Sequence, residues 1–151
     1  MTKRAGKSLG CVRYHFGGKA GLYQAVLSQS LDTLSAVVAS VSPGRDVLWR
    51  TLLGLTRVMS AEPNTARLFL RAALDAPGDI GGEVRALIDD LAKVIAGPGG
   101  ERAATAGDPH ALAVECLCTV ATAVLLPAKD EALPPVDPRL LALYLLELVK
   151  P

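Results

Sequence analysis

The side chains best suited to binding chemistry lie together near the N-terminus, in the segment from 8 to 27, SLGCVRYHFGGKAGLYQAVL. Ser8 is a good helix N-cap, and Val12 and Phe16, four residues apart, give a short helix one apolar side. Three basic or aromatic side chains fan out around the rest of that helix: Arg13, Tyr14 and His15. Side chains of these types bind the phosphates and base edges of nucleic acids. The segment therefore predicts a nucleic-acid-binding surface on a short helix.

A tight turn and a second helix follow. Gly17 and Gly18 permit a sharp reversal of the chain, and Lys19 stands where the next helix begins. The first amides of a helix attract anions, so Lys19 adds a second phosphate-binding feature at the same place. A short outward helix backed by a phosphate contact fits the recognition helix of a helix-turn-helix. Alone, His15 is more often an ordinary surface histidine and Tyr14 a packing residue, so the prediction depends on the combination.

Charge is distributed unevenly along a chain whose net charge is +1. Five basic residues precede the first acidic residue, Asp32: Lys3, Arg4, Lys7, Arg13 and Lys19. Subtracting these five from 16 leaves 11 basic residues against 15 acidic ones, so the rest of the chain carries a charge of −4. A basic end on an acidic body favours an anionic partner at residues 1 to 19, with nucleic acid ahead of a membrane surface. A solvated basic tail explains the charge equally well.

The stretch RAGKSLGCVRYHFGGKAGLYQAVL, from 4 to 27, resembles the exit of the helix-turn-helix in tetracycline-repressor (TetR) type transcriptional regulators. That family carries an alanine-glycine turn, a serine cap, an aromatic-histidine-phenylalanine run and a long helix that begins with lysine. The resemblance implies a recognition helix at 8 to 16 and a connecting helix at 19 to 41. It also implies DNA contacts from seven positions: Ser8, Leu9, Cys11, Arg13, Tyr14, His15 and Lys19. Among these, Lys19 and Tyr14 would contact phosphates, while Val12 and Phe16 would pack inward.

The chain departs from that family's pattern in three places. Lys7 stands where the family has a small apolar residue in the turn, and Cys11 replaces the usual threonine. The family's first helix and most of its second would precede this motif, and only 2 to 5 remain of them. The resemblance therefore implies a helix-turn-helix truncated at its N-terminus. Three explanations are open: a start codon assigned too late, a deliberate truncation, and a natural fragment that dimerises without binding DNA.

Apolar residues recur at helical spacing along the rest of the chain and no strand-like alternation is present. The expected helices cover 19 to 41, 45 to 60, 65 to 74, 80 to 95, 108 to 126 and 139 to 149. Asp108 and Asp137, each followed by proline, are typical of helix starts, and Glu62 with Pro63 predicts a break. We therefore expect an all-α helical bundle, with a partial DNA-binding region and connecting helix at 1 to 41 and ligand-binding and dimerisation helices at 42 to 151.

Two of the expected helices are apolar on more than one side. The segments 108 to 126 and 138 to 150 carry too many apolar residues for a single buried stripe, LLALYLLELV above all. Pairing with their symmetry copies would form a four-helix interface in a homodimer. The alternative is that both helices are central within one subunit.

The resemblance also implies an effector pocket among the middle helices. The bulky or polar candidates for its lining are Trp49, Leu53, Met59, Phe69, Arg71, His110 and Glu115. An apolar pocket with a few polar anchors suits a small lipophilic or aromatic effector. The competing interpretation is that Trp49, Met59 and Phe69 are ordinary core residues.

The sequence lacks the patterns typical of an enzyme. His15 and His110 are far apart, no metal-ligand spacing occurs, and the glycine run from 97 to 102 lacks the lysine and hydroxyl of a phosphate loop. We therefore predict no enzymatic activity, no cofactor and no metal. The three cysteines are expected to be reduced thiols.

No apolar run reaches the roughly 18 residues of a membrane span, and the N-terminus does not resemble a signal peptide, so a cytoplasmic protein without membrane contact is expected. The combined prediction is a DNA-binding transcriptional regulator, a repressor that responds to a small-molecule effector and lacks part of its DNA-binding domain. The alternative function is a ligand-sensing or dimerisation module that does not itself bind DNA.

Overall fold

The prediction of an all-α bundle is confirmed for the part of the chain that the computed structural model describes, namely 9 to 44, 46 to 75, 80 to 97, 107 to 125, 137 and 139 to 143. Those residues form helices and contain no strand. The labelled helices are α1 (Leu9–Phe16), α2 (Lys19–Ser40), α3 (Val47–Ala61), α4 (Pro63–Asp75), α5 (Ile80–Ala96) and α7 (Pro109–Leu125). Residues 139 to 143 add a short helical segment.

The helix boundaries follow local backbone chemistry. Asp108 begins α7 by accepting a hydrogen bond from the His110 amide at 3.1 Å, and Asp137 accepts one from the Arg139 amide at 2.8 Å. Both predicted caps are thereby confirmed. The predicted start of α4 at 65 is wrong by two residues, because Pro63 occupies the first helical position, where a proline nitrogen needs no hydrogen.

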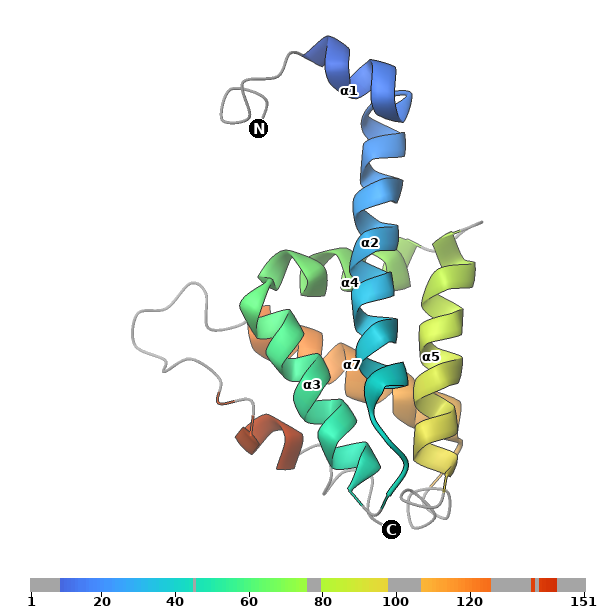
Figure 1. Ribbon diagram of the computed structural model, residues 1–151, viewed down its shortest axis with the longest axis vertical. Coiled ribbons are helices and arrows are strands. Elements are labelled where there is room, and N and C mark those ends of the chain that lie inside the picture. Colours follow the sequence, from blue (N-terminus) through green and yellow to red (C-terminus); the bar gives the residue numbers. More distant parts are fainter. Residues whose placement is uncertain are drawn as a thin grey trace.

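One apolar core holds α2, α3, α4, α5 and α7 together (Figure 1). The lower half of α2 contributes four buried side chains at helical spacing: Leu27, Leu31, Leu34 and Val38. Leu52 and Met59 from α3, Phe69 from α4, Leu87 from α5 and Leu117 from α7 complete the fully buried centre. The predicted boundary between two regions lies after residue 41. The lower half of α2, which precedes this boundary, nevertheless packs in one core with α3, α4, α5 and α7, which together we call the body.

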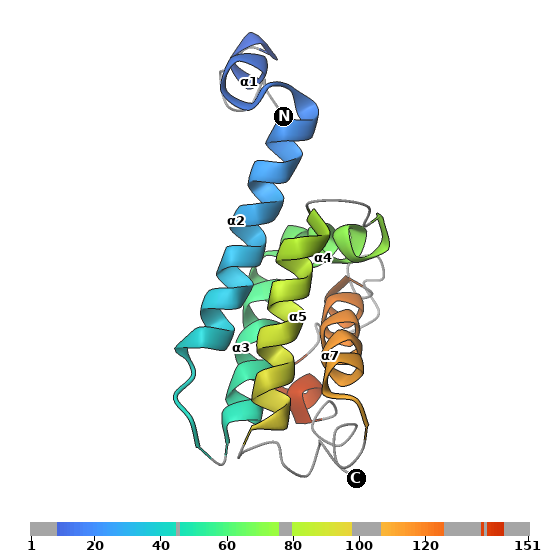
Figure 2. The same ribbon diagram turned by 90° about the vertical axis from the view of Figure 1, so that its right-hand side faces the viewer.

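The upper half of α2 leaves this core. Figures 1 and 2 show the first turns of α2 and the whole of α1 standing clear of the other helices. The expected apolar stripe on α2 is buried only from Leu27 onward, since Leu22 is half-buried and the side chain of Val26 is 42% exposed. The helix thus acts as a rigid arm whose root is buried and whose tip carries α1.

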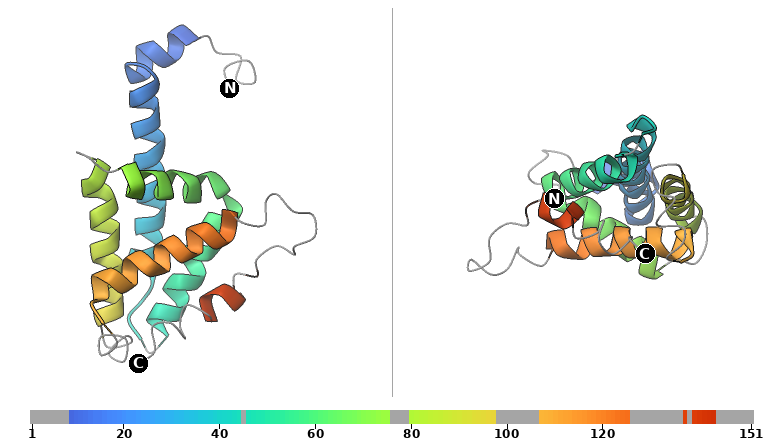
Figure 3. Two further views of the ribbon diagram at one scale, coloured as in Figure 1. Left: turned by 180° about the vertical axis from the view of Figure 1, so that it is seen from behind. Right: turned by 90° about the horizontal axis from the view of Figure 1, so that it is seen from below.

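An outer face of the bundle is formed by α7, which crosses the rear of the molecule as seen in Figure 3. The outward residues of this helix include Ala111 and Val114, which is 40% exposed, but also the polar side chains of His110, Glu115 and Thr122. A shallow hollow of about 320 Å³ lies on the same helix, lined by Cys118, Thr119, Thr122 and Ala123. Among the described residues, none of the helices has the length and apolar character that crossing a membrane requires.

The two cysteines of α7 differ in environment, as their spacing on a helix predicts. Both are free thiols, and Cys116 is buried in the core while Cys118 is half-buried. Burial, reinforced by the nearby carboxylate of Glu115, raises the pKa of the Cys116 thiol to about 12. Burial also raises the pKa of Cys118. The third cysteine, Cys11, has its side chain outside the described set.

This difference gives a stability prediction at alkaline pH. Because the pKa of Cys116 is raised in the folded protein, its thiol stabilises the fold fully below the unfolded-state pKa and loses that contribution as pH rises toward 12. We expect the difference in unfolding free energy between the wild type and Cys116→Ala to shrink by about 1.4 kcal/mol per pH unit above about pH 8.5. Urea unfolding, monitored by circular dichroism at each pH, measures this difference in unfolding free energy. The matched variant Cys118→Ala should show a smaller change, and equal behaviour of the two variants would contradict the assignment.

Candidate nucleic-acid interface

The candidate interface is α1, an eight-residue helix at the free end of α2. Its packing contacts are with α2, so nothing in the body covers it from the other sides among the described residues. Figure 2 shows α1 crossing the tip of α2 at a steep angle. The sequence prediction of a short helix, a glycine turn and a long helix is confirmed.

Two glycines make the corner between these helices. Gly17 has a φ of 68° and Gly18 a φ of 132°, both in the region that side-chain-bearing residues rarely adopt. The Gly17 amide donates to the Arg13 carbonyl at 3.1 Å, closing α1. The Leu22 amide donates to the Gly18 carbonyl at 3.1 Å, opening α2. The chain therefore reverses within two residues and fixes α1 against the first turn of α2.

A third glycine, which the sequence analysis did not single out, makes this corner tight. Gly21 lies one turn into α2, where a Cβ atom would overlap with the carbonyl oxygen of Phe16 and lie 2.9 Å from its carbonyl carbon. The end of α1 rests on this bare stretch of backbone. The signal available in the sequence was a glycine within a helix, which costs stability unless another backbone approaches closely there.

The outward side chains of α1 are those that the sequence predicted to face solvent. Arg13 and His15 are exposed and Tyr14 is 86% exposed. The rings of Tyr14 and His15 meet edge to face, with centroids 5.1 Å apart. Phe16, expected to pack inward, is instead 41% exposed, because the corner turns its side chain away from the described core.

Positive charge at this end of the molecule is not neutralised by the described residues. Arg13 and Lys19 are exposed, and no acidic side chain of the described chain pairs with either. Gly18 caps α2 without a side-chain hydrogen bond, so the first amides of the helix beside Lys19 have no side-chain acceptor. A lysine together with open helix amides is an arrangement that attracts phosphate.

Three of the seven predicted DNA contacts are only partly located. Ser8 lies outside the described residues, and Leu9 and Cys11 are placed on α1 by their backbone while their side chains are not described. The other four, Arg13, Tyr14, His15 and Lys19, are brought together at the corner of α1 and α2.

The candidates for an effector pocket are not gathered around one hollow. Met59 and Phe69 are fully buried in the core, and Trp49 and Leu53 pack against it. Arg71 is exposed on α4, where its guanidinium lies over the ring of Tyr23. Glu115 and His110 are exposed on α7. Met59 and Phe69 therefore fit the competing interpretation, in which they are ordinary core residues.

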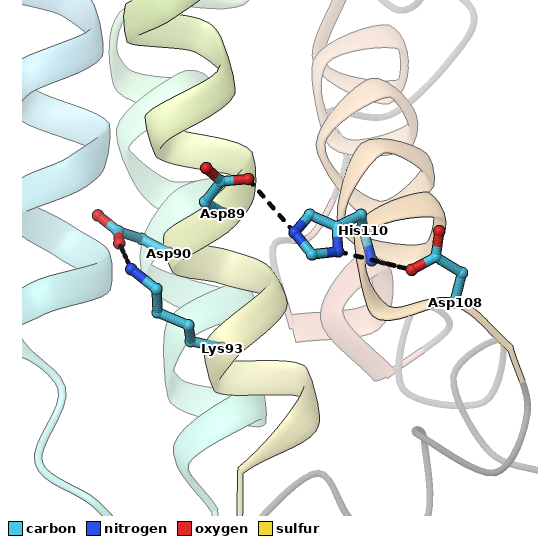
Figure 4. Close-up of polar contacts among 5 residues, drawn as sticks. All are labelled: Asp89, Asp90, Lys93, Asp108 and His110. Atoms are coloured by element: carbon cyan, nitrogen blue, oxygen red, sulfur yellow. Dashed lines mark hydrogen bonds and ion pairs between the residues drawn. The ribbon is translucent and has the colours of Figure 1, made fainter.

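His110 lines an open cleft of about 450 Å³ between α5 and the start of α7 (Figure 4). Its Nε2 lies 3.3 Å from Asp89 and its Nδ1 lies 3.5 Å from Asp108. Beside it, Lys93 pairs with Asp90 at 2.7 Å, and the hydrogen bond that Lys93 donates to this carboxylate raises the lysine pKa. Ala92, Ala96 and Pro109 supply the apolar part of the cleft.

These groups do not form a metal centre. Within the described residues, no cluster of three histidine, cysteine, aspartate or glutamate side chains has the geometry to hold a metal ion.

Comparisons with known proteins give no relative from which a function could be transferred. No protein-family model matches the chain, and neither a curated protein nor a solved structure is significantly similar to it.

The corner generates a prediction about Gly21. Replacing it with alanine forces the new methyl group into the backbone of Phe16, so α1 must separate from α2. We expect amide hydrogen exchange in α1 to accelerate at least tenfold while exchange in α3 and α7 is unchanged. Gly82→Ala is the matched control, since nothing lies within 4 Å of a Cβ there. That control should gain up to about 1 kcal/mol in stability. Unchanged exchange in Gly21→Ala would show that the close approach does not exist.

Proposed function

We propose that this chain is a DNA-binding transcriptional regulator of the TetR type, a repressor in which α1 is the recognition helix. The observation that supports the proposal is the exposed group of Arg13, Tyr14, His15 and Lys19, held by a glycine corner at the tip of α2. No acidic residue precedes Asp32, so the whole tip is positive while the body is acidic. A double-stranded DNA operator is the partner that this chemistry fits.

The dimensions of α1 suit the major groove. An α-helix with its side chains is about 10–12 Å across, which matches the groove's width of about 12 Å, and α1 has eight residues to lie in it. Arg13 and His15 lie about 200° apart around the helix, so one of them would face base edges, while Tyr14 and Lys19 would contact phosphates. The two kinds of contact have separate consequences, because phosphate contacts set affinity and base contacts set sequence preference.

In the proposed regulator, two copies pair through α7 and the following helix, the segments 108 to 126 and 138 to 150. Support comes from the outward surface of α7, with Val114 40% exposed and a row of small residues beside it. In the described part of 139 to 143, Leu140 is 66% and Leu143 50% exposed. Exposed apolar side chains on both segments are what pairing between two copies would bury.

A small lipophilic or aromatic effector would act on the body and change the spacing of the two recognition helices. Since α2 shares the core with α3, α4, α5 and α7, a rearrangement of those helices necessarily moves the root of α2. The effector site itself follows only from the family resemblance.

DNA binding is tested by fluorescence anisotropy of the full chain with a labelled duplex from the region upstream of its own coding sequence. We expect an affinity that falls steeply with salt, because each phosphate contact contributes about 0.9 to the slope of log K against log salt. Arg13→Ala/Lys19→Ala should abolish binding at moderate salt. The control is Arg57→Ala/Arg67→Ala, which removes two exposed arginines from α3 and α4. If the folded protein does not bind any upstream duplex, the chain is a sensing or pairing module without DNA-binding activity.

Pairing through α7 is tested by analytical ultracentrifugation. An arginine at Val114 would place an unpaired charge in the proposed interface, at a cost of several kcal/mol. We expect Val114→Arg to weaken the dimer by about two orders of magnitude or more. Val26→Arg is a control of nearly equal exposure on α2, 42% against 40%. A wild-type chain that sediments as a monomer at all concentrations would reject this interface.

A further inference from the structure

The orientation of α1 depends on where α2 leaves the body. Below Leu27 the helix is held by buried side chains on successive turns. Above Leu27 no side chain of α2 is fully buried in the described structure, and α1 adds no contact with the body. The buried half of α2 sets the mean direction of the exposed arm, so contacts that reach α2 at this exit point can only restrict its remaining tilt.

Among the described residues, a cation–π contact from α4 and a hydrogen bond to α5 reach α2 there. The guanidinium carbon of Arg71 on α4 lies 5.5 Å from the centre of the Tyr23 ring on α2. The Ser28 hydroxyl on α2 donates to Oε1 of Glu83 on α5 at 3.3 Å. Figure 1 shows α2 crossing α4 at this level with α5 alongside.

Of the two contacts, the one between Tyr23 and Arg71 lies nearer to α1 and restrains α2 more than the one between Ser28 and Glu83. Its distance lies within the roughly 6 Å over which a cation is attracted to an aromatic face. The ring of Tyr23 also packs against the apolar core, so its body is anchored while its face receives Arg71. An aromatic side chain has few rotatable bonds, which makes it an effective brace. The Ser28 contact is long and exposed, and contributes less.

We infer that Tyr23 and Arg71 are positioning residues that restrict the tilt of the arm by which α2 carries α1 away from the body. Eight residues separate Lys19 from Leu27, a lever of about 12 Å, so a tilt of about 10° at the exit point moves α1 by about 2 Å. Hydrogen bonds to base edges are lost when the donor and acceptor move apart by this distance. The consequence for DNA binding rests on the proposed function, whereas the mechanical role does not.

The mechanical role is measured by double electron-electron resonance between spin labels at Ala20→Cys and Arg85→Cys, both exposed positions, one on the arm and one on α5. The labelled chain carries replacements of the three native cysteines: Cys11→Ala, Cys116→Ala and Cys118→Ala. Dilution with unlabelled protein restricts the measurement to pairs within one chain. Circular dichroism and the thermal midpoint establish that each variant is folded.

We expect Tyr23→Leu and Arg71→Met to broaden the distance distribution, and Tyr23→Phe, which keeps the aromatic face, to leave it unchanged. An exposed cation–π pair changes the ratio of held to released arms by about two- to fivefold. The double variant Tyr23→Leu/Arg71→Met should be no broader than the broader single variant. Arg67→Met is the matched control, because Arg67 lies one turn away on α4 and bonds Asn64 instead.

The inference is overturned if Tyr23→Leu has the wild-type distribution, or if Arg67→Met broadens it equally. Anisotropy with DNA then separates the two proposals. If wild type binds, Tyr23→Leu should bind two- to fivefold more weakly and Tyr23→Phe as wild type does. If wild type does not bind DNA but Tyr23→Leu still broadens the distribution, the proposed function fails and the positioning role stands.

Discussion

The burial of the lower half of α2 is the constraint on which the rest of the structure depends. Leu27, Leu31, Leu34 and Val38 insert one side of this helix among α3, α4, α5 and α7, and each is nearly inaccessible to solvent. A helix of 22 residues fixed over half its length must project its other half outward as a stiff arm. The same buried contacts thus supply the centre of the body and the support for the exposed tip.

At the tip of α2, the position of α1 depends on backbone sterics and not on apolar burial. Gly17 and Gly18 adopt positive φ values, and Gly21 lets the end of α1 approach the backbone of α2. These requirements hold α1 without a core of its own, so its aromatic and basic side chains remain exposed. An exposed aromatic side chain such as Tyr14 gains free energy when a partner covers it. The corner thus keeps Tyr14 available for the proposed contact with DNA.

In the described part of the body, two surfaces where a partner or ligand could act differ in character. The outer surface of α7 is open and carries small residues beside Val114, which fits another helix. The cleft beside His110 is polar at its edges, since Asp89 and Asp108 contact the His110 ring and Lys93 pairs with Asp90. The side chains expected to form an internal pocket are divided instead between a closed core and the surface, because Met59 and Phe69 face the same centre as Leu52.

The sequence by itself determined the helices, their caps and the glycine corner, because these depend on periodicity and on neighbours within a few residues: Asp108 caps α7, and Gly17 turns the chain, wherever those helices pack. The exposure of Arg13 and Tyr14 followed from the same local pattern. Only the tertiary structure decided that the stripe on α2 is buried from Leu27 onward, and that Arg71 meets Tyr23 rather than a pocket. Such pairings depend on how helices far apart in sequence cross in space, and periodicity gives the apolar side of a helix without giving its partner.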